Sequence, residues 1–129
     1  MEINKDNLYQ YYNIIYETIR RALNRETEIE TGIKSLSNGN EYMTGYTKDL
    51  YDYLQSLDFN SIKVIQTIMY IGRDSFFDDN NGKCDFDEVY DYFNGQGWNT
   101  KEIETNQIDE KTPLGRYLIN GLYKINFLL

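Results

Sequence analysis

The sequence predicts an all-α fold, a single-domain bundle of about five helices that spans residues 1–129. Apolar residues recur at three- and four-residue spacing in several segments, which is typical of helices with one buried face. No segment shows the alternation of apolar and polar residues that a half-buried strand requires. With 129 residues and a hydrophobic fraction of 40%, the chain is long enough to bury one core and too short for two.

The first helix is expected at residues 6–25, with Asp6 as the residue that caps its amino end. The apolar positions that define its buried face are Leu8, Tyr12, Ile15, Ile19 and Leu23. Residues 26–45 follow and contain three glycines together with several Ser, Thr and Asn residues. Such a composition is typical of loops. We therefore predict a flexible polar loop at residues 26–45, after the first helix.

The most apolar helix is expected at residues 60–71, after a helix at residues 46–57. Its apolar residues cover more than one face, which predicts a central, buried helix. Its β-branched residues are also compatible with a strand, but its length and its interspersed polar residues favour a helix. Asn60 or Ser61 would cap its amino end, and Gly72 occupies the position of a left-handed carboxyl cap.

Three further helical segments are expected in the second half of the chain. The first follows an acidic turn and ends at Gly95 and Gly97. The second is short and has Thr100 as its cap. The last has Thr112 as its cap and Pro113 at the first helical position, where the missing N–H of proline costs no hydrogen bond.

The composition excludes several kinds of site. The chain has no histidine and a single cysteine, Cys84, which rules out a disulfide, a Ser-His-Asp triad, a Cys-His dyad and the usual zinc sites within one chain. Its formal net charge of −8, from 21 acidic and 13 basic side chains, repels nucleic acids and anionic lipids. We therefore expect no nucleic-acid partner, no membrane partner and no cofactor.

The amino-terminal stretch MEINKDNLYQYY lacks the basic start and the apolar run of a signal peptide, and no apolar segment approaches the length of a membrane span. A cytoplasmic location is the resulting expectation.

The stretch FFDDNNGKCDFDE, which begins at Phe76, resembles a calcium-binding loop in its acids, its glycine and its late glutamate. With Gly82 at the sixth position of an EF-hand loop, acceptable ligands fall at the third, fifth and twelfth positions, but Phe77 falls at the first and offers no oxygen. Turn formation and helix capping explain the same residues, so we do not expect a specific calcium site. Weak divalent-metal binding stays an alternative, with Asp78, Asp79, Asn81, Asp85 and Glu88 as the candidate ligands.

Two segments resemble a bacterial family of uncharacterised small acidic proteins, a domain of unknown function. Residues 70–73, Tyr-Ile-Gly-Arg, match its aromatic-Ile/Leu-Gly-Arg-Gly-Asp helix end, although Asp74 follows directly where the family has a second glycine. A second match is to its carboxyl-terminal Thr-Pro-Leu-Leu-Gly-Asp-Tyr-Leu helix. The residues that fit this second pattern are Thr105, Thr112, Pro113, Leu114, Gly115, Tyr117, Leu118, Gly121 and Leu122. The resemblance implies a mostly helical bacterial protein and implies no activity.

Four residues are candidates for binding. Arg73 and Asp74 follow the buried helix and could line a pocket with Thr112. Thr112 is at the start of the last helix, where free backbone N–H groups attract anions. The alternative is a structural ion pair that fixes two helices together. Trp98, between a glycine and an asparagine, could be an exposed binding aromatic or could fill a gap in the core.

Three classes of function are compatible with these observations. The first is a protein-binding regulatory module, such as an immunity protein or antitoxin that inhibits a basic partner, and the surplus of acid and tyrosine favours it. The second is an enzyme that uses only carboxylates, Arg, Lys or Tyr, with the acidic turn as its densest supply of carboxylates. The third is a structural subunit that assembles through its apolar carboxyl end. The chain could be a monomer or a homodimer.

Overall fold

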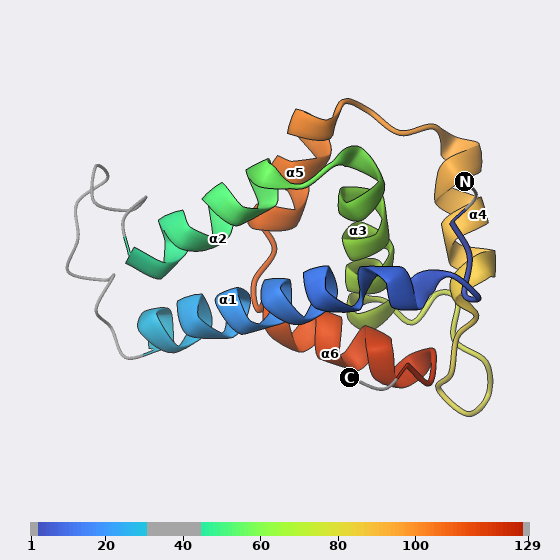
Figure 1. The fold of residues 1–129 in the computed structure, drawn as a ribbon. Coiled ribbons are helices and arrows are strands. Elements are labelled where there is room, and N and C mark those ends of the chain that lie inside the picture. The colour runs from blue at the N-terminus through green and yellow to red at the C-terminus, as the bar shows by residue number, and fades with distance from the viewer. Residues whose placement is uncertain (1–2, 31–44, 128–129) are drawn as a thin grey trace.

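The computed structural model describes residues 3–30 and 45–127, with no side-chain placement for residues 29 and 30. The described residues form one 3-10 helix and six α-helices and no strand, which confirms the predicted all-α bundle (Figure 1). The elements are η1 (Leu8–Tyr11), α1 (Tyr12–Glu30), α2 (Gly45–Ser56), α3 (Phe59–Arg73), α4 (Phe86–Gln96), α5 (Lys101–Asp109) and α6 (Leu114–Lys124). No helix in this part of the chain combines the length and the apolar character that crossing a membrane requires.

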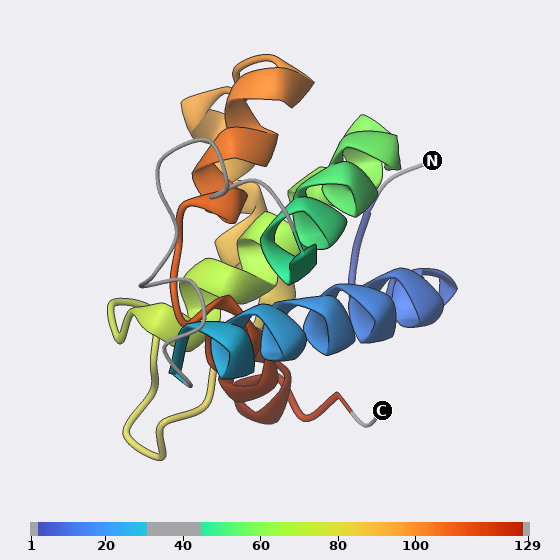
Figure 2. The ribbon, with the colours of Figure 1, turned by 90° about the vertical axis from the view of Figure 1, so that its left-hand side faces the viewer.

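Helix α3 is the centre of the bundle, as its apolar surface predicts. Helices α1 and α6 lie side by side on one side of it, and α2 continues that layer (Figures 1 and 2). Helices α4 and α5 contact α3 from other directions. The α3 side chains Ile62, Val64, Ile65, Ile68 and Met69 are fully buried. Because α3 is apolar on several faces, the other helices can enclose it on several sides.

Gly72 does not form the predicted left-handed cap. It lies inside α3, which continues to Arg73. A Cβ atom on Gly72 would lie 1.7 Å from the carbonyl oxygen of Tyr117 on α6, and a Cβ atom on Gly121 would lie 2.2 Å from the carbonyl oxygen of Ile68 on α3. The two glycines therefore let the backbones of α3 and α6 touch, and this close crossing explains both residues better than a cap does.

The predicted loop at residues 26–45 is wrong at both of its ends. Residues 26–30 are the last turns of α1, Gly45 is the first residue of α2, and residues 31–44 lie outside the described part of the chain. Glu26 accepts a hydrogen bond from the backbone N–H of Gly115 at 2.6 Å. Sequence reasoning missed this extension because the stabilising partner of Glu26 lies 89 positions away in the chain.

The cap of the last helix also differs from the prediction. Thr112 does not cap α6, and Pro113 is the N-cap residue rather than the first helical residue, with no side-chain capping bond of its own. The Glu26 carboxylate bonds the Gly115 N–H instead. A free N–H at a helix terminus can donate to any well-placed oxygen, including one from a distant helix.

Other helix ends divide between confirmed and wrong predictions. Asp85 caps α4 and Thr100 caps α5 through their side chains, and α4 ends at Gln96, with Gly97 at its carboxyl cap in a positive-φ conformation. Asp6 caps nothing: Asn7 is the N-cap of η1, and α1 begins only at Tyr12. Asp58, rather than Asn60 or Ser61, caps α3.

Candidate functional site

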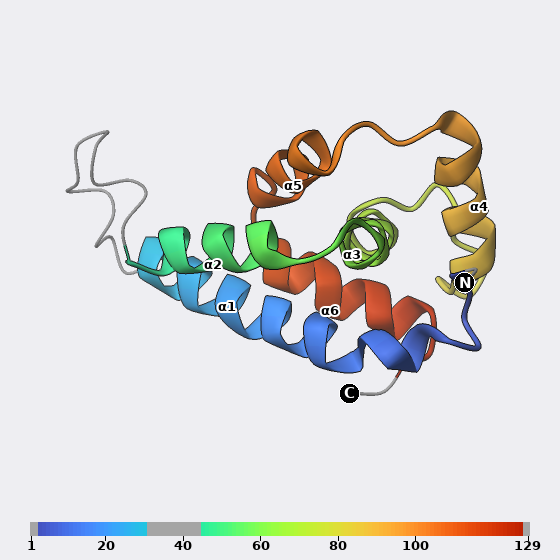
Figure 3. The ribbon, with the colours of Figure 1, turned by 45° about the horizontal axis from the view of Figure 1, so that its top comes forward.

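Two adjoining cavities lie along the face of α3 between α4 and α5, and we call them together the α3 groove. Figure 3 shows α3 nearly end-on, with α4 on one side and α5 on another. The aromatic cavity, of about 210 Å³, is lined by Tyr70, Asp74, Phe76, Phe77, Tyr92 and Phe93. The carboxylate cavity, of about 140 Å³, is lined by Gln66, Tyr70, Phe93, Gln96, Gly97, Trp98, Asn99, Glu104 and Gln107. Tyr70 and Phe93 line both cavities, so the two adjoin.

The aromatic cavity is built by rings from α3, α4 and the segment between them. Phe77 packs edge-on against Tyr92 with ring centroids 5.1 Å apart, and Tyr70 lies 5.2 Å from Phe93. Phe76 packs edge-on against Phe77 at 4.9 Å and is still 79% exposed, and Tyr92 is 45% exposed. Edge-to-face contacts of this kind fix the rings relative to one another. The result is a rigid apolar surface that is open to solvent.

Arg73 and Asp74 lie at the edge of this cavity and form an ion pair with each other, with Arg73 Nε 2.9 Å from Asp74 Oδ1. The Arg73 guanidinium also lies over the Tyr70 ring, 4.9 Å from its centroid. The hydrogen bond to Asp74 raises the pKa of Arg73. Asp74 lines the aromatic cavity, but Arg73 does not. Among the described residues, no hydrogen bond or ion pair joins Arg73 or Asp74 to Thr112, whose carbonyl oxygen accepts a bond from the Tyr117 hydroxyl. A pocket of Arg73, Asp74 and Thr112 stays a prediction.

The carboxylate cavity contains two polar side chains that are almost completely buried. Gln66 on α3 is 2% exposed and Glu104 on α5 is 4% exposed. The Gln66 amide nitrogen donates to Glu104 Oε1 at 3.3 Å and to Gln107 Oε1 at 3.1 Å. The second Glu104 oxygen accepts from the backbone N–H of Asn99 at 3.2 Å. The Gln66 amide oxygen has no hydrogen-bond partner. This end of the groove therefore holds a buried carboxylate and a buried amide oxygen that has no partner.

Trp98 closes the carboxylate cavity and is neither fully exposed nor fully buried. Its ring lies 6.1 Å from the rings of both Tyr90 and Phe93, so it packs against the core. Its indole N–H donates to Asn94 Oδ1 at 3.1 Å. Of the two alternatives, packing against the core is the one that the contacts show, and a ring that also lines a cavity can still contact a ligand.

The acidic turn, residues 78–88, does not gather its carboxylates. Asp78 pairs with Lys124 at 2.9 Å, and Asp85 caps α4. Asp79 accepts the backbone N–H groups of Asn81 and Lys83, which lower its pKa. Among the described residues, no group of three or more Asp, Glu and Cys side chains is placed to hold a metal ion. The contacts thus show these carboxylates in an ion pair, a turn and a helix cap.

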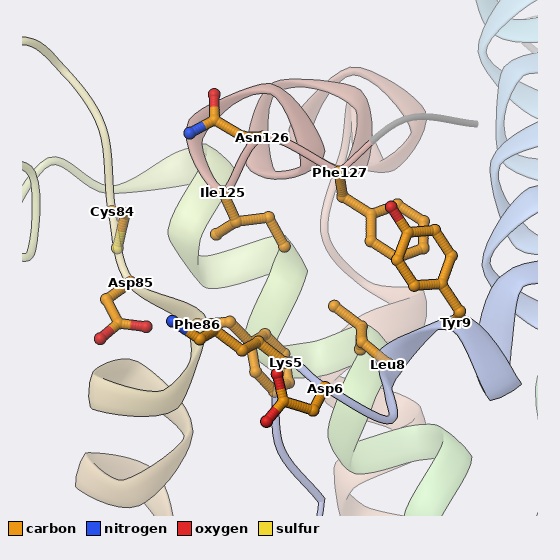
Figure 4. A pocket seen from close by; sticks show the side chains of 10 residues that line it. All are labelled: Lys5, Asp6, Leu8, Tyr9, Cys84, Asp85, Phe86, Ile125, Asn126 and Phe127. Atoms are coloured by element: carbon orange, nitrogen blue, oxygen red, sulfur yellow. The ribbon is translucent and has the colours of Figure 1, made fainter.

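A further cavity of about 410 Å³ lies between the amino-terminal segment, the acidic turn and the carboxyl end (Figure 4). Tyr9 and Phe127 stack at one side of it with ring centroids 4.5 Å apart. Cys84 also lines it, and burial raises the pKa of the Cys84 thiol to about 11. The thiol is protonated at neutral pH, so it is a poor nucleophile and a poor metal ligand. This cavity offers less defined chemistry than the α3 groove.

Comparison of the chain with protein-family models, with curated proteins and with solved structures finds no match. The resemblance to a bacterial domain of unknown function therefore stays a prediction.

Sequence reasoning identified Asp74 and Trp98 and missed the residues between and around them. Phe76 and Phe77 were considered only as the start of a failed calcium loop. Two adjacent phenylalanines in a polar, acidic segment are themselves a signal, because such rings either pack against the core, as Phe77 does in part, or form an exposed apolar surface, as Phe76 does. Glu104 and Gln66 gave no signal, since their proximity depends on how α5 packs on α3.

Proposed function

We propose that this chain is a protein-binding module that holds a basic partner at the α3 groove and regulates or inhibits it, in the manner of an immunity protein or antitoxin. The cluster of solvent-open rings carries this proposal, because Phe76 is 79% exposed and Tyr92 is 45% exposed. Exposed apolar patches mark interaction sites. Large aromatic side chains are also enriched among the residues that dominate binding energy.

The charge of the partner follows from the carboxylates beside the rings. Asp74 lines the aromatic cavity itself. Phe77 also lines a neighbouring cavity of about 330 Å³ together with Asp79 and Glu88. Arg73 and Lys83 offset part of this charge, but the whole chain carries −8. An acidic surface attracts a basic protein and accelerates its encounter with the module. A bacterial, cytoplasmic setting belongs to this proposal.

The test is capture of a partner by the tagged protein from a lysate of its own host at low salt. We expect one stoichiometric basic protein that raised salt releases. The double variant Phe76→Ala with Tyr92→Ala should weaken binding of the purified partner at least tenfold, since each truncated anchor costs on the order of 1–2 kcal/mol. The measurement is titration calorimetry.

The matched control is the double variant Tyr16→Ala with Tyr46→Ala, which truncates rings that are 49% and 47% exposed on α1 and α2, away from the groove. Its affinity should stay within twofold of wild type. Equal losses in the two double variants, or no basic protein retained, would overturn the proposal. A homodimer that only the Phe76 and Tyr92 variant dissociates would assign the groove to self-assembly instead.

A further inference from the structure

We infer that the carboxylate cavity binds the guanidinium group of an arginine side chain, and that this arginine belongs to the basic partner proposed above. The inference rests on that proposed function for the source of the arginine, but the chemistry of the cavity is argued independently. Three features of the cavity carry it: a buried carboxylate without a cation, a buried amide oxygen without a partner, and aromatic side chains in the lining.

The Glu104 carboxylate is buried without an opposite charge. Among the described residues, no Lys or Arg forms an ion pair with Glu104, whose partners are the Gln66 amide and the Asn99 backbone N–H. The Lys63 amine instead lies over the rings of Phe59 and Trp98, 4.7 and 5.7 Å from their centroids. Buried carboxylates are usually paired with a cation. A cation from another molecule would complete this site.

The two buried polar side chains of the cavity, Gln66 and Glu104, have acceptor capacity that the chain leaves unused, and a ligand that donates hydrogen bonds would use it. The Gln66 amide nitrogen uses its two hydrogens on Glu104 and Gln107, and the Trp98 indole N–H is used on Asn94. The Gln66 amide must point its nitrogen, and not its oxygen, at Glu104, because an ionised carboxylate can only accept a hydrogen bond. Its oxygen is left buried without a partner. Each carboxylate oxygen of Glu104 accepts one bond and can accept another. Guanidinium supplies five N–H donors and no acceptor.

The walls match the shape of a guanidinium. Trp98, Tyr70 and Phe93 line the cavity with their rings. A planar, weakly hydrated guanidinium stacks on such faces, and a cation over a tryptophan face is the strongest of these contacts. The neighbouring aromatic cavity already shows the same preference within the chain, because Arg73 lies over Tyr70 at 4.9 Å. An anion would be repelled by Glu104, and a neutral ligand would leave its charge unpaired.

The experiment uses Trp98 as the reporter, because it is the only tryptophan of the chain. N-acetyl-arginine methylamide is titrated into the full chain while Trp98 fluorescence and the indole N–H cross-peak in the NMR spectrum are recorded. The comparison ligand is N-acetyl-citrulline methylamide, in which a neutral urea of nearly the same shape replaces the guanidinium. We expect a saturable response to the arginine probe and at least tenfold weaker binding of the citrulline probe. Equal affinities would overturn the inference.

Glu104→Gln tests the carboxylate, with Glu102→Gln as its control. Both variants remove one negative charge from α5, but Glu102 is exposed and Glu104 is buried. Binding of the arginine probe should weaken at least tenfold in Glu104→Gln and stay within twofold in Glu102→Gln. Similar losses in both would overturn the inference. Should Glu104→Gln fail to fold, the comparison of the arginine and citrulline probes on the wild-type chain still tests whether the cavity binds a guanidinium group.

The outcome is separable from that of the proposed function. A partner captured through Phe76 and Tyr92, with no discrimination between the arginine and citrulline probes, would leave the protein-binding module standing and refute the arginine site. Discrimination between the two probes without any captured partner would leave the arginine site standing and refute the basic protein partner.

Discussion

Gly72 and Gly121 lie where α3 and α6 cross, and each faces the backbone of the other helix. A Cβ on Gly121 would lie 2.2 Å from the carbonyl oxygen of Ile68, which a rotamer change cannot relieve because that atom is backbone. We expect Gly121→Ala to lower the free energy of unfolding by about 3 kcal/mol, the upper range for overpacking, despite the better helix propensity of alanine. Urea denaturation measures it.

Gly95 is the matched control at this scale. It lies in α4, and a Cβ there would meet no atom within 4 Å. Gly95→Ala should therefore raise the free energy of unfolding by about 0.5–1 kcal/mol. A loss from Gly95→Ala as large as that from Gly121→Ala would show that the cost is not the helix crossing.

Glu26 makes stability depend on pH. Burial raises its pKa above the ordinary 4.5, although the Gly115 N–H bond and the charges of Arg25 and Arg116 oppose the shift. The folded chain thus binds this proton more tightly than the unfolded chain. The stability that the proton contributes is fully present below pH 4.5 and is lost as pH rises through the pKa of the folded state. Glu26→Gln has no such proton. Between pH 4 and pH 7 the wild type should lose this stability and the variant should not, so we expect the free energy of unfolding of Glu26→Gln to rise relative to that of the wild type.

Glu26→Ala separates the cap from the charge. Glutamine keeps an oxygen for the Gly115 N–H and alanine does not, while both are neutral. The alanine variant should be less stable than the glutamine variant by about 1 kcal/mol at every pH, the usual value of a lost amino-terminal cap. Thermal melts of the wild type and of both variants between pH 4 and pH 7 measure both effects. A relative stability of Glu26→Gln that falls as pH rises would contradict the burial argument.

At the scale of elements, the sequence predicted the existence of helices better than their ends. The periodicity of α3 and α6 is local information, so it can be recognised without the fold. The end of α1 depends on a contact between Glu26 and Gly115, and the role of Gly72 depends on a helix crossing. Both are tertiary contacts between segments far apart in sequence. Caps that are local, such as Thr100 on α5, were predicted correctly.

The cap of α3 provides an element-scale prediction. Asp58 accepts the backbone N–H of Ser61 at 2.8 Å, and hydrogen bonds from Ser61 lower its pKa below the ordinary 3.8. We expect Asp58→Ala to lower the free energy of unfolding by about 1 kcal/mol at neutral pH. The wild-type advantage should shrink as pH falls below 3.8 through the folded pKa, because protonation weakens the acceptor.

Asn60, which the sequence offered as an alternative cap, is the control. It is exposed in the first turn of α3, and Asn60→Ala should change stability by less than about 0.5 kcal/mol. Chemical denaturation of the two variants in parallel decides between the caps, and the larger loss in Asn60→Ala would reverse the assignment.

At the scale of the whole molecule, the groove is a product of packing. Its lining comes from α3, α4, α5 and the segments on either side of α4. Sequence reasoning pointed to Asp74 and Trp98 because they are conspicuous in their local context. It could not show that Gln66 and Glu104, which are 38 positions apart, meet in one cavity. The acidic balance, by contrast, is visible without the fold and is one basis for the proposal of a basic partner.

Salt should therefore act with opposite signs on the fold and on the complex. The net charge of −8 makes the folded chain repel itself, and several of the described ion pairs, such as Arg20 with Glu17, are too exposed to offset this. Raising NaCl from about 10 to 200 mM screens the repulsion, and we expect the melting temperature to rise by roughly 2–4 °C, about 1 kcal/mol. The same change should weaken partner binding.

The opposite signs make the salt experiment informative. Loss of the partner at high salt cannot be explained by unfolding if scanning calorimetry shows the chain to be more stable there. A melting temperature that falls with salt would mean that favourable ion pairs outweigh the repulsion. Release of the partner by salt would then no longer identify an electrostatic interface, because the loss of the fold could cause it. Measuring both quantities in one salt series therefore decides whether the acidic charge of this chain serves binding.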